Sequence, residues 1–187
     1  MERKKDIRKR VLGLRNNMSK EEWEEKSHRI NKKVVAHPFF LEANVIYCYV
    51  DYRNEVGTEW IMKKAWKLHK KVAVPKVEGD EMKFYIISKF DDLHAGYRGI
   101  QEPEDSHPAN TEDAVVILPG VAFDRKRNRI GYGKGFYDKF LDKHPSCKTI
   151  AIGFECQIVD EIQTDSFDYR PDILITEEYT YDEQFAE

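Results

Sequence analysis

Two short apolar runs constrain the fold of this chain more than any other feature of its sequence. Residues 44–50 (N-V-I-Y-C-Y-V) and 114–118 (A-V-V-I-L) are apolar at nearly every position and rich in β-branched or aromatic residues. Such runs are typical of strands that are covered on both faces, as in a parallel sheet between layers of helices. Runs of the same kind predict further strands at residues 72–75, 82–87, 149–154 and 172–175.

Helical patterns alternate with these strands. Helices are expected over residues 2–16, from a capping box at Ser19–Glu22 to the His37-Pro38 pair, from an N-cap at Thr58 to Leu68, and over residues 134–142. Residues 88–113 are expected to be polar and irregular. The alternation predicts a single-domain, three-layer α/β sandwich with a mostly parallel sheet, spanning residues 1–187. Ligands of such sheets bind outside the carboxyl ends of the strands.

Composition narrows the class of protein. The 187 residues are 41% hydrophobic, and 31 Lys or Arg against 34 Asp or Glu give a net charge of −3. A mildly acidic chain is a poor binder of extended nucleic acid, although six of the first ten residues are basic. Three cysteines without a C-x-x-C pattern argue against disulfides and a zinc site. Without a signal peptide or a long apolar stretch, we expect a soluble cytoplasmic protein that binds neither membranes nor nucleic acid.

The stretch from Arg129 to Asp138 (R-I-G-Y-G-K-G-F-Y-D) carries the strongest functional signal. Three alternating glycines allow backbone N–H groups to approach an anion closely, and Lys134 adds a positive charge. The pattern fits neither the P-loop nor the Rossmann fingerprint, since Phe136 stands where the last glycine of the latter would be. A plain glycine-rich turn between a strand and a helix is the alternative; the flanking charges favour phosphate binding.

Two pairs of charged residues are spaced one helical turn apart. Lys4 and Arg8 would share one face of the first helix and point at one anion, or simply form a solvated basic face. Lys134 and Asp138 would project from a helix that begins inside the glycine loop, the lysine to a phosphate and the aspartate to Mg²⁺. An ordinary intrahelical ion pair is the alternative for the second pair.

Three further carboxylates follow predicted strands or flank them. Glu55 lies just past the 44–50 strand, where it would accept two hydrogen bonds from an amino-pyrimidine edge or remain a surface glutamate. Asp168 and Asp172 flank the last predicted strand, as metal ligands or as turn residues beside Pro171. The histidines are scattered without a metal-binding pattern, so a transition-metal site is not expected.

Taken together, these pieces resemble the 5-formyltetrahydrofolate cyclo-ligase family, also called methenyltetrahydrofolate synthetases. The matching segments occur in order through nearly the whole chain: Lys4 with Arg8, E-V-G-T (55–58), G-I-Q-E-P (99–103), L-P-G-V-A-F-D (118–124), the glycine segment, and F-D-Y-R-P-D (167–172). The resemblance implies a fold similar to the sugar-phosphate isomerase and CoA-transferase group. It also implies ATP as co-substrate, Mg²⁺ as cofactor and 5-formyltetrahydrofolate as substrate. We expect a monomer or a weak homodimer.

The resemblance also assigns roles to residues. It implies catalytic roles for Arg8, Arg129 and Lys134, and metal ligands at Asp138 and Asp168. The implied ATP-binding residues are Lys4, Lys5, Asp6, Ile7, Arg8, Arg129, Ile130, Gly131, Tyr132, Gly133, Lys134, Gly135, Phe136 and Tyr137. The implied folate-binding residues are Val50, Glu55, Tyr132, Gly133, Lys134, Gly135 and Phe136. Some relatives carry Arg at the position of Tyr132 and Tyr at that of Phe136.

The implied reaction accounts for this inventory. Phosphorylation of the formyl oxygen by ATP makes a leaving group, and the neighbouring folate nitrogen then attacks the formyl carbon. The protein must align the reactants and neutralise charge rather than supply a nucleophile. From the residues alone, two alternatives stay open: a kinase or isomerase acting on a sugar phosphate, and a nucleotide- or RNA-binding regulator that uses the basic patches.

Overall fold

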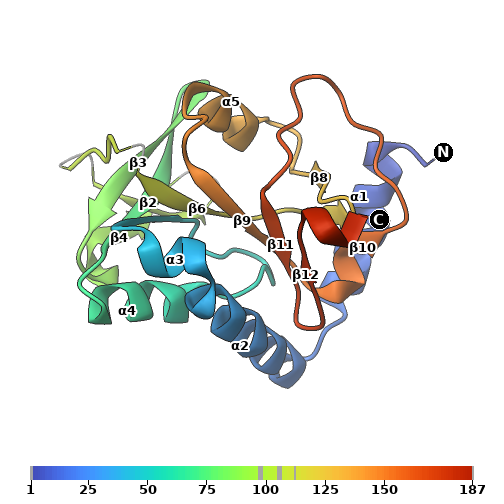
Figure 1. Ribbon diagram of the computed structural model, residues 1–187, viewed down its shortest axis with the longest axis horizontal. Helices are drawn as coiled ribbons and strands as arrows, with labels where there is room; N and C mark the ends of the chain where they lie inside the picture. The colour runs from blue at the N-terminus through green and yellow to red at the C-terminus, as the bar shows by residue number, and fades with distance from the viewer. Residues whose placement is uncertain (1, 97–98, 105–106, 112, 187) are drawn as a thin grey trace.

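A seven-stranded sheet runs through the middle of the molecule (Figure 1) in the order β12-β11-β9-β6-β1-β2-β3. The computed structural model describes residues 2–96, 99–104, 107–111 and 113–186, with the backbone only at 185–186. The strands of the sheet are β1 (Val45–Cys48), β2 (Lys71–Glu78), β3 (Glu81–Ile87), β6 (Ala114–Leu118), β9 (Lys148–Ile152), β11 (Ile173–Ile175) and β12 (Thr180–Tyr181). All pairings from β11 through β2 are parallel, and the two outer pairings are antiparallel. The predicted α/β fold with a mostly parallel sheet is confirmed.

Helices cover both faces of this sheet. Figure 1 shows α2, α3 and α4 on one face and α5 on the other, with α1 beyond the β11 side. The helices are α1 (Lys4–Asn16), α2 (Lys20–Ala36), α3 (Pro38–Glu42), α4 (Glu59–Lys67) and α5 (Phe136–Lys143), with short 3-10 turns η1 (Phe90–Asp92), η3 (Glu155–Gln157) and η4 (Glu183–Ala186). Alternate residues of β1 enter separate cores, Ile46 under α2 and α4 and Tyr47 under α5. Strands buried on both faces therefore read as continuous apolar runs.

Two small sheets were not expected from the sequence. One pairs β4 (Leu93–Ala95) with β5 (Gln101–Pro103), so the prediction that 88–113 is irregular is wrong there; residues 97–98, 105–106 and 112 lie outside the described parts of the chain. The other joins β10 (Ile158–Val159), β7 (Ala122–Asp124) and β8 (Arg129–Ile130). Strands of two or three residues are too short for their periodicity to show in a sequence.

The predicted helix starts are partly correct. The Ser19 hydroxyl accepts the backbone N–H of Glu22 at 3.1 Å, as a capping residue should. Thr58 is the N-cap of α4, but its hydroxyl donates to the Tyr49 carbonyl at 2.8 Å and makes no cap hydrogen bond. Helix α5 begins at Phe136 and not at Lys134, because Gly135 adopts a left-handed conformation that cannot continue into a helix.

The strand order reverses between β1 and β6. From β1 the chain continues to its neighbour β2 on one side, whereas from β6 it reaches β9 on the other side through the β7–β8 hairpin and α5. Crevices open at the carboxyl ends of strands at such a reversal and hold the ligands of open α/β sheets. In the described parts of the chain, no helix has the length and apolar character needed to cross a membrane.

Candidate active site

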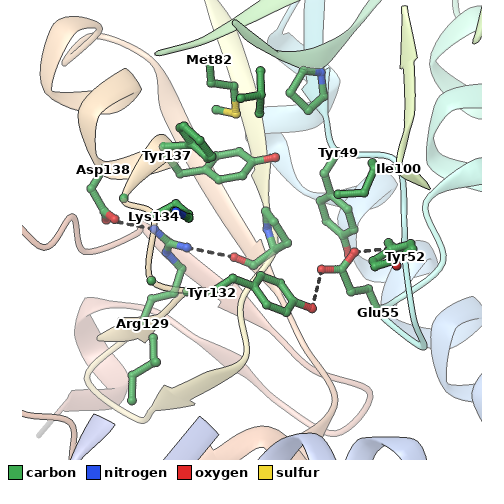
Figure 2. Close-up of a pocket in the computed structure, with 18 of the residues that line it drawn as sticks. Tyr49, Tyr52, Glu55, Met82, Ile100, Arg129, Tyr132, Lys134, Tyr137 and Asp138 are labelled. Carbon is green, nitrogen blue, oxygen red and sulfur yellow. Dashed lines mark hydrogen bonds and ion pairs between the residues drawn. The ribbon is translucent and has the colours of Figure 1, made fainter. Parts of the chain in front are cut away.

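A cavity of about 670 Å³ opens at the carboxyl ends of β1 and β6. Tyr49 and Val50, which follow β1, form part of its lining, and so does Pro119, which follows the neighbouring strand β6. Figure 2 shows Tyr49 in this cavity. Its size is that of sites that bind cofactors and substrates. The cavity therefore lies where the strand pattern predicted a ligand.

The glycine loop, residues 131–135, forms one wall between β8 and α5. Gly133 and Gly135 have φ of +96° and +66°, values that residues other than glycine adopt only with strain. Lys134 lies between them, exposed at the cavity, and precedes α5. The prediction that Lys134 and Asp138 share one helix is therefore wrong, although both line the cavity.

Two arginines hold this loop. Arg8 from α1 donates through Nε to the Gly131 carbonyl at 2.7 Å. Arg129 is buried, donates through Nη1 to the Pro119 carbonyl at 3.2 Å, and forms an ion pair through Nη2 with Asp138 at 2.9 Å (Figure 2). Both guanidinium groups are fixed before any ligand arrives, so the loop is preorganised for an anion.

A second charged cluster lies where α1 meets the loop that precedes β11. The ammonium group of Lys4 contacts Asp165 at 2.7 Å and Asp168 at 2.6 Å. Partial burial opposes the charge of Lys4, but the two carboxylates outweigh it and raise its pKa. Asp168 also accepts the backbone N–H of Asp165 at 2.8 Å, which closes the turn that carries Phe167 into the cavity lining.

Two carboxylates in the cavity lining could serve as ligands of a metal ion. Among the described residues, no group of three or more His, Cys, Asp or Glu side chains is arranged to hold a metal by itself. Asp138 and Asp168 nevertheless both line the cavity. They offer the hard oxygen ligands that Mg²⁺ prefers, and Mg²⁺ in nucleotide sites is commonly held by one or two carboxylates together with the substrate's phosphates.

Glu55 forms the opposite wall on a strained turn. The turn runs from Tyr52 to Glu55, and its central residues Arg53 and Asn54 have φ of +47° and +57°. Such values cost energy for a residue like arginine and persist where surrounding contacts enforce them. Here Glu55 accepts the Tyr52 backbone N–H at 2.8 Å and the Tyr132 hydroxyl at 2.9 Å (Figure 2).

Burial makes Glu55 an unusual carboxyl group. Only 7% of its surface is exposed, and burial raises its pKa to about 7 although the hydrogen bonds from Tyr52 and Tyr132 favour the ionised form. Burial and the nearby Glu55 carboxylate raise the pKa of Tyr132 to about 12. Glu55 was expected either as a surface residue or as a ligand contact, and its burial in the cavity wall favours the second interpretation.

An apolar wall between these two sides was missed by sequence reasoning. The β2–β3 hairpin extends past β1, which pairs with β2 only over Lys71–Ala73, and places Pro75, Val77 and Met82 in the cavity lining with Ile100. Apolar residues in a predicted strand look like core residues, so only the length of the hairpin could have signalled this wall. A planar apolar ligand would fit against it.

The structure brings together most of the residues that were expected at the site. Those in the cavity lining are Lys4, Arg8, Val50, Glu55, Arg129, Ile130, Gly131, Tyr132, Gly133, Lys134, Gly135, Phe136, Tyr137, Asp138 and Asp168. Lys5, Asp6 and Ile7 lie outside it: Ile7 is buried in a small core beneath α1 and Asp6 pairs with Arg3, because successive helical residues point in different directions. Asp172 accepts from Thr149, as a structural residue. Other lining residues were not predicted: Tyr49, Tyr52, Arg53, Gln101, Glu102, Pro119, Asp165 and Phe167.

Fold and cavity together define an α/β protein with a cationic glycine loop on one side of its site and a buried carboxylate on the other. A family model described as the 5-formyltetrahydrofolate cyclo-ligase family matches residues 1–177. The chain belongs to this family, whose members are enzymes.

Individual relatives agree with this assignment. The chain is 28% identical to a probable 5-formyltetrahydrofolate cyclo-ligase of Caenorhabditis elegans, over 93% of this chain and 92% of the relative. It is 32% identical to one of Schizosaccharomyces pombe, over 80% of this chain and 82% of the relative. The solved structure of Aquifex aeolicus 5,10-methenyltetrahydrofolate synthetase superposes with a TM-score of 0.85 at 31% identity, over 96% of this chain and 92% of that one. The suggested group of related folds, the cytoplasmic location and the oligomeric state remain predictions.

Proposed function

We propose that this protein catalyses the ATP- and Mg²⁺-dependent cyclisation of 5-formyltetrahydrofolate to 5,10-methenyltetrahydrofolate, with release of ADP and phosphate. The observation that carries the proposal is the two-sided cavity. The glycine loop and its cations line one side, Glu55 lines the other, and an apolar wall lies between them. A single-substrate sugar-phosphate enzyme would have no use for the apolar side.

Each reactant has a matching wall. The triphosphate of ATP would lie along residues 131–135, where Lys134 is exposed and Arg8 stands beside Gly131. The pterin would lie against Pro75, Val77 and Met82, with its amino-pyrimidine edge donating to Glu55. Asp138 and Asp168 would hold Mg²⁺, whose charge offsets that of the phosphates.

The reaction joins these two walls in two steps. The formyl oxygen attacks the γ-phosphorus of ATP and ADP leaves; the neighbouring folate nitrogen then attacks the formyl carbon, loses its proton, and phosphate departs. Within the protein, Lys134 and Arg8 would offset negative charge on the transferred group, while Glu55 fixes the pterin. Alignment of the two reactants supplies most of the rate gain, because no group of the protein needs to form a covalent bond.

The test is a direct absorbance assay that needs no coupling enzyme. Methenyl product absorbs in the near ultraviolet, so absorbance should rise when the protein, 5-formyltetrahydrofolate, ATP and Mg²⁺ are mixed, and omission of any one should abolish the rise. Release of ADP should match product formation one for one. Folded protein that gives no ATP-dependent rise, or that turns over a sugar phosphate without folate, would contradict the proposal.

A further inference from the structure

Arg15, at the end of α1, is a buried charge that the proposed reaction does not use. Only 1% of its surface is exposed. Its Nε and Nη1 atoms have no hydrogen-bond partner, and among the described residues no carboxylate lies within ion-pair distance of it. Burying a guanidinium group without a direct counter-ion is costly, so its retention in the fold calls for a reason.

The contacts of Arg15 point toward Glu55. Its Nη2 atom donates to the Tyr132 hydroxyl at 2.9 Å and to the Arg53 carbonyl at 3.0 Å. The Tyr132 hydroxyl in turn donates to Oε1 of Glu55 at 2.9 Å. One guanidinium nitrogen therefore holds both the hydroxyl that contacts the carboxylate and the strained turn that carries it.

The geometry points to Arg15 as the positioning residue of the folate site: through Tyr132 and the 52–55 turn it orients the Glu55 carboxyl group into the cavity and favours its ionised form. This inference rests on the proposed function only for the identity of the ligand. Arg15, Tyr132 and the turn come from three segments that are distant in sequence, α1, the glycine loop and the loop after β1. The same tyrosine joins the two walls of the cavity.

The other groups that face Glu55 make this contribution necessary. Asp51, on the same loop, opposes ionisation of Glu55. Burial first, and then the Glu55 carboxylate, raise the pKa values of the Tyr49, Tyr132 and Tyr137 phenols. Of the charged groups that act on Glu55, Arg15 favours the ionised form. About half of the Tyr132 surface is exposed, but its hydroxyl group lies between Arg15 and Glu55. The hydrogen bond from Arg15 polarises the O–H bond of Tyr132 and so strengthens the hydrogen bond that this hydroxyl donates to Glu55.

The experiment compares three variants in the ligand-free protein and in turnover. Arg15→Met keeps the length of the side chain and removes its charge, Arg15→Lys keeps a charge, and Tyr132→Phe removes only the hydroxyl. The first readout is the titration of Glu55, followed by the ¹³C resonance of its carboxyl carbon. We expect the midpoint to rise by about one pH unit in Arg15→Met and Tyr132→Phe and to stay close to the wild type in Arg15→Lys.

The second readout is the pH dependence of kcat/KM for 5-formyltetrahydrofolate. Its acidic limb should move to higher pH by the same amount, a loss of about tenfold near pH 6 with recovery at pH 9. In Arg15→Met the KM for ATP should stay unchanged. Tyr132→Phe, which keeps the ring, tests the relay if Arg15→Met fails to fold. An unchanged titration of Glu55 in both variants would overturn the inference, whereas wild-type protein without folate turnover would overturn the proposed function and leave the titration result standing.

Discussion

Replacing Glu55 by glutamine should make the ligand-free protein more stable at high pH while it weakens the site. Glu55 is buried, and its pKa is raised from 4.5 to about 7. Between pH 4.5 and about pH 7, Glu55 has lost its proton in the unfolded chain but still keeps it in the folded chain. The free energy of unfolding therefore falls as pH rises through this window and levels off above it, by roughly 3 kcal/mol in total.

The glutamine variant lacks this titration. Its other effects, such as the loss of a counter-charge near Arg15, do not depend on pH in this range because arginine stays protonated. The stability difference between variant and wild type should thus grow by roughly 3 kcal/mol between pH 4.5 and pH 8. With a urea m-value of about 2 kcal/mol per molar, the two unfolding midpoints should diverge by roughly 1.5 M over that range.

Urea unfolding of both proteins at half-unit pH steps measures this difference directly. Glu25→Gln, which removes an exposed carboxylate of α2, is the matched control and should differ from the wild type by a constant amount. A constant difference for Glu55→Gln as well would refute the reasoning. The same variant should bind folate on the order of a hundredfold more weakly, since it loses a charged hydrogen-bond acceptor, so stability and function are opposed at this position.

Three further substitutions test the cavity. Lys134→Ala should lower kcat by a factor of about 10²–10³, as loss of one preorganised charge does, whereas Lys139→Ala, an exposed lysine of α5 outside the cavity, should not; equal rates would remove Lys134 from the chemistry. Asp138→Asn keeps an oxygen that can accept from Arg129 and should raise the Mg²⁺ concentration needed for half-maximal rate; an unchanged Mg²⁺ titration would argue against a metal role. Phe167 is 74% exposed at the cavity and sits on the turn that Lys4 holds. Phe167→Ala should leave stability within about 0.5 kcal/mol and raise the KM for ATP several-fold through lost stacking on the base; unchanged KM values for both substrates would exclude a stacking role.

The sheet and the glycine loop could be predicted because their signals are local. Strands buried on both faces require continuous apolar runs, and residues 114–118 have one. Gly133 and Gly135 occupy positive-φ positions that few other residues tolerate. Their positions in the sequence therefore indicate the conformation of the loop. The predicted start of α5 at residue 134 was wrong because Gly135, with its positive φ, still belongs to the loop, and the helix begins only after it. Helix boundaries are the least certain part of such predictions.

The Glu55 side of the cavity could not be predicted in the same way. Its conformation depends on Arg15, Tyr132 and Trp23, whose indole N–H donates to the Glu55 carbonyl at 2.7 Å, and these residues are 32 to 77 positions away from Glu55 along the chain. In the sequence, Arg15 resembles the other basic residues of its helix, and the residues next to it in the chain do not indicate that it is buried. Tertiary packing alone makes a polar side chain of this kind part of a site.

Two cations of the cavity lining, Lys4 and Arg129, already form ion pairs in the ligand-free fold, and such pairs would suit the proposed binding of a metal nucleotide. Lys4 contacts Asp168 and Arg129 contacts Asp138. Lys4 also contacts Asp165, so it keeps one carboxylate partner if a phosphate takes the place of Asp168. The released Asp168 would then face the cation that accompanies that phosphate. Arg129 is different, because its buried side chain also donates to the Pro119 carbonyl and so stays fixed when Asp138 changes partner. The cluster therefore combines one mobile pair, which can reorganise on binding, with one rigid pair, which holds the glycine loop in place throughout.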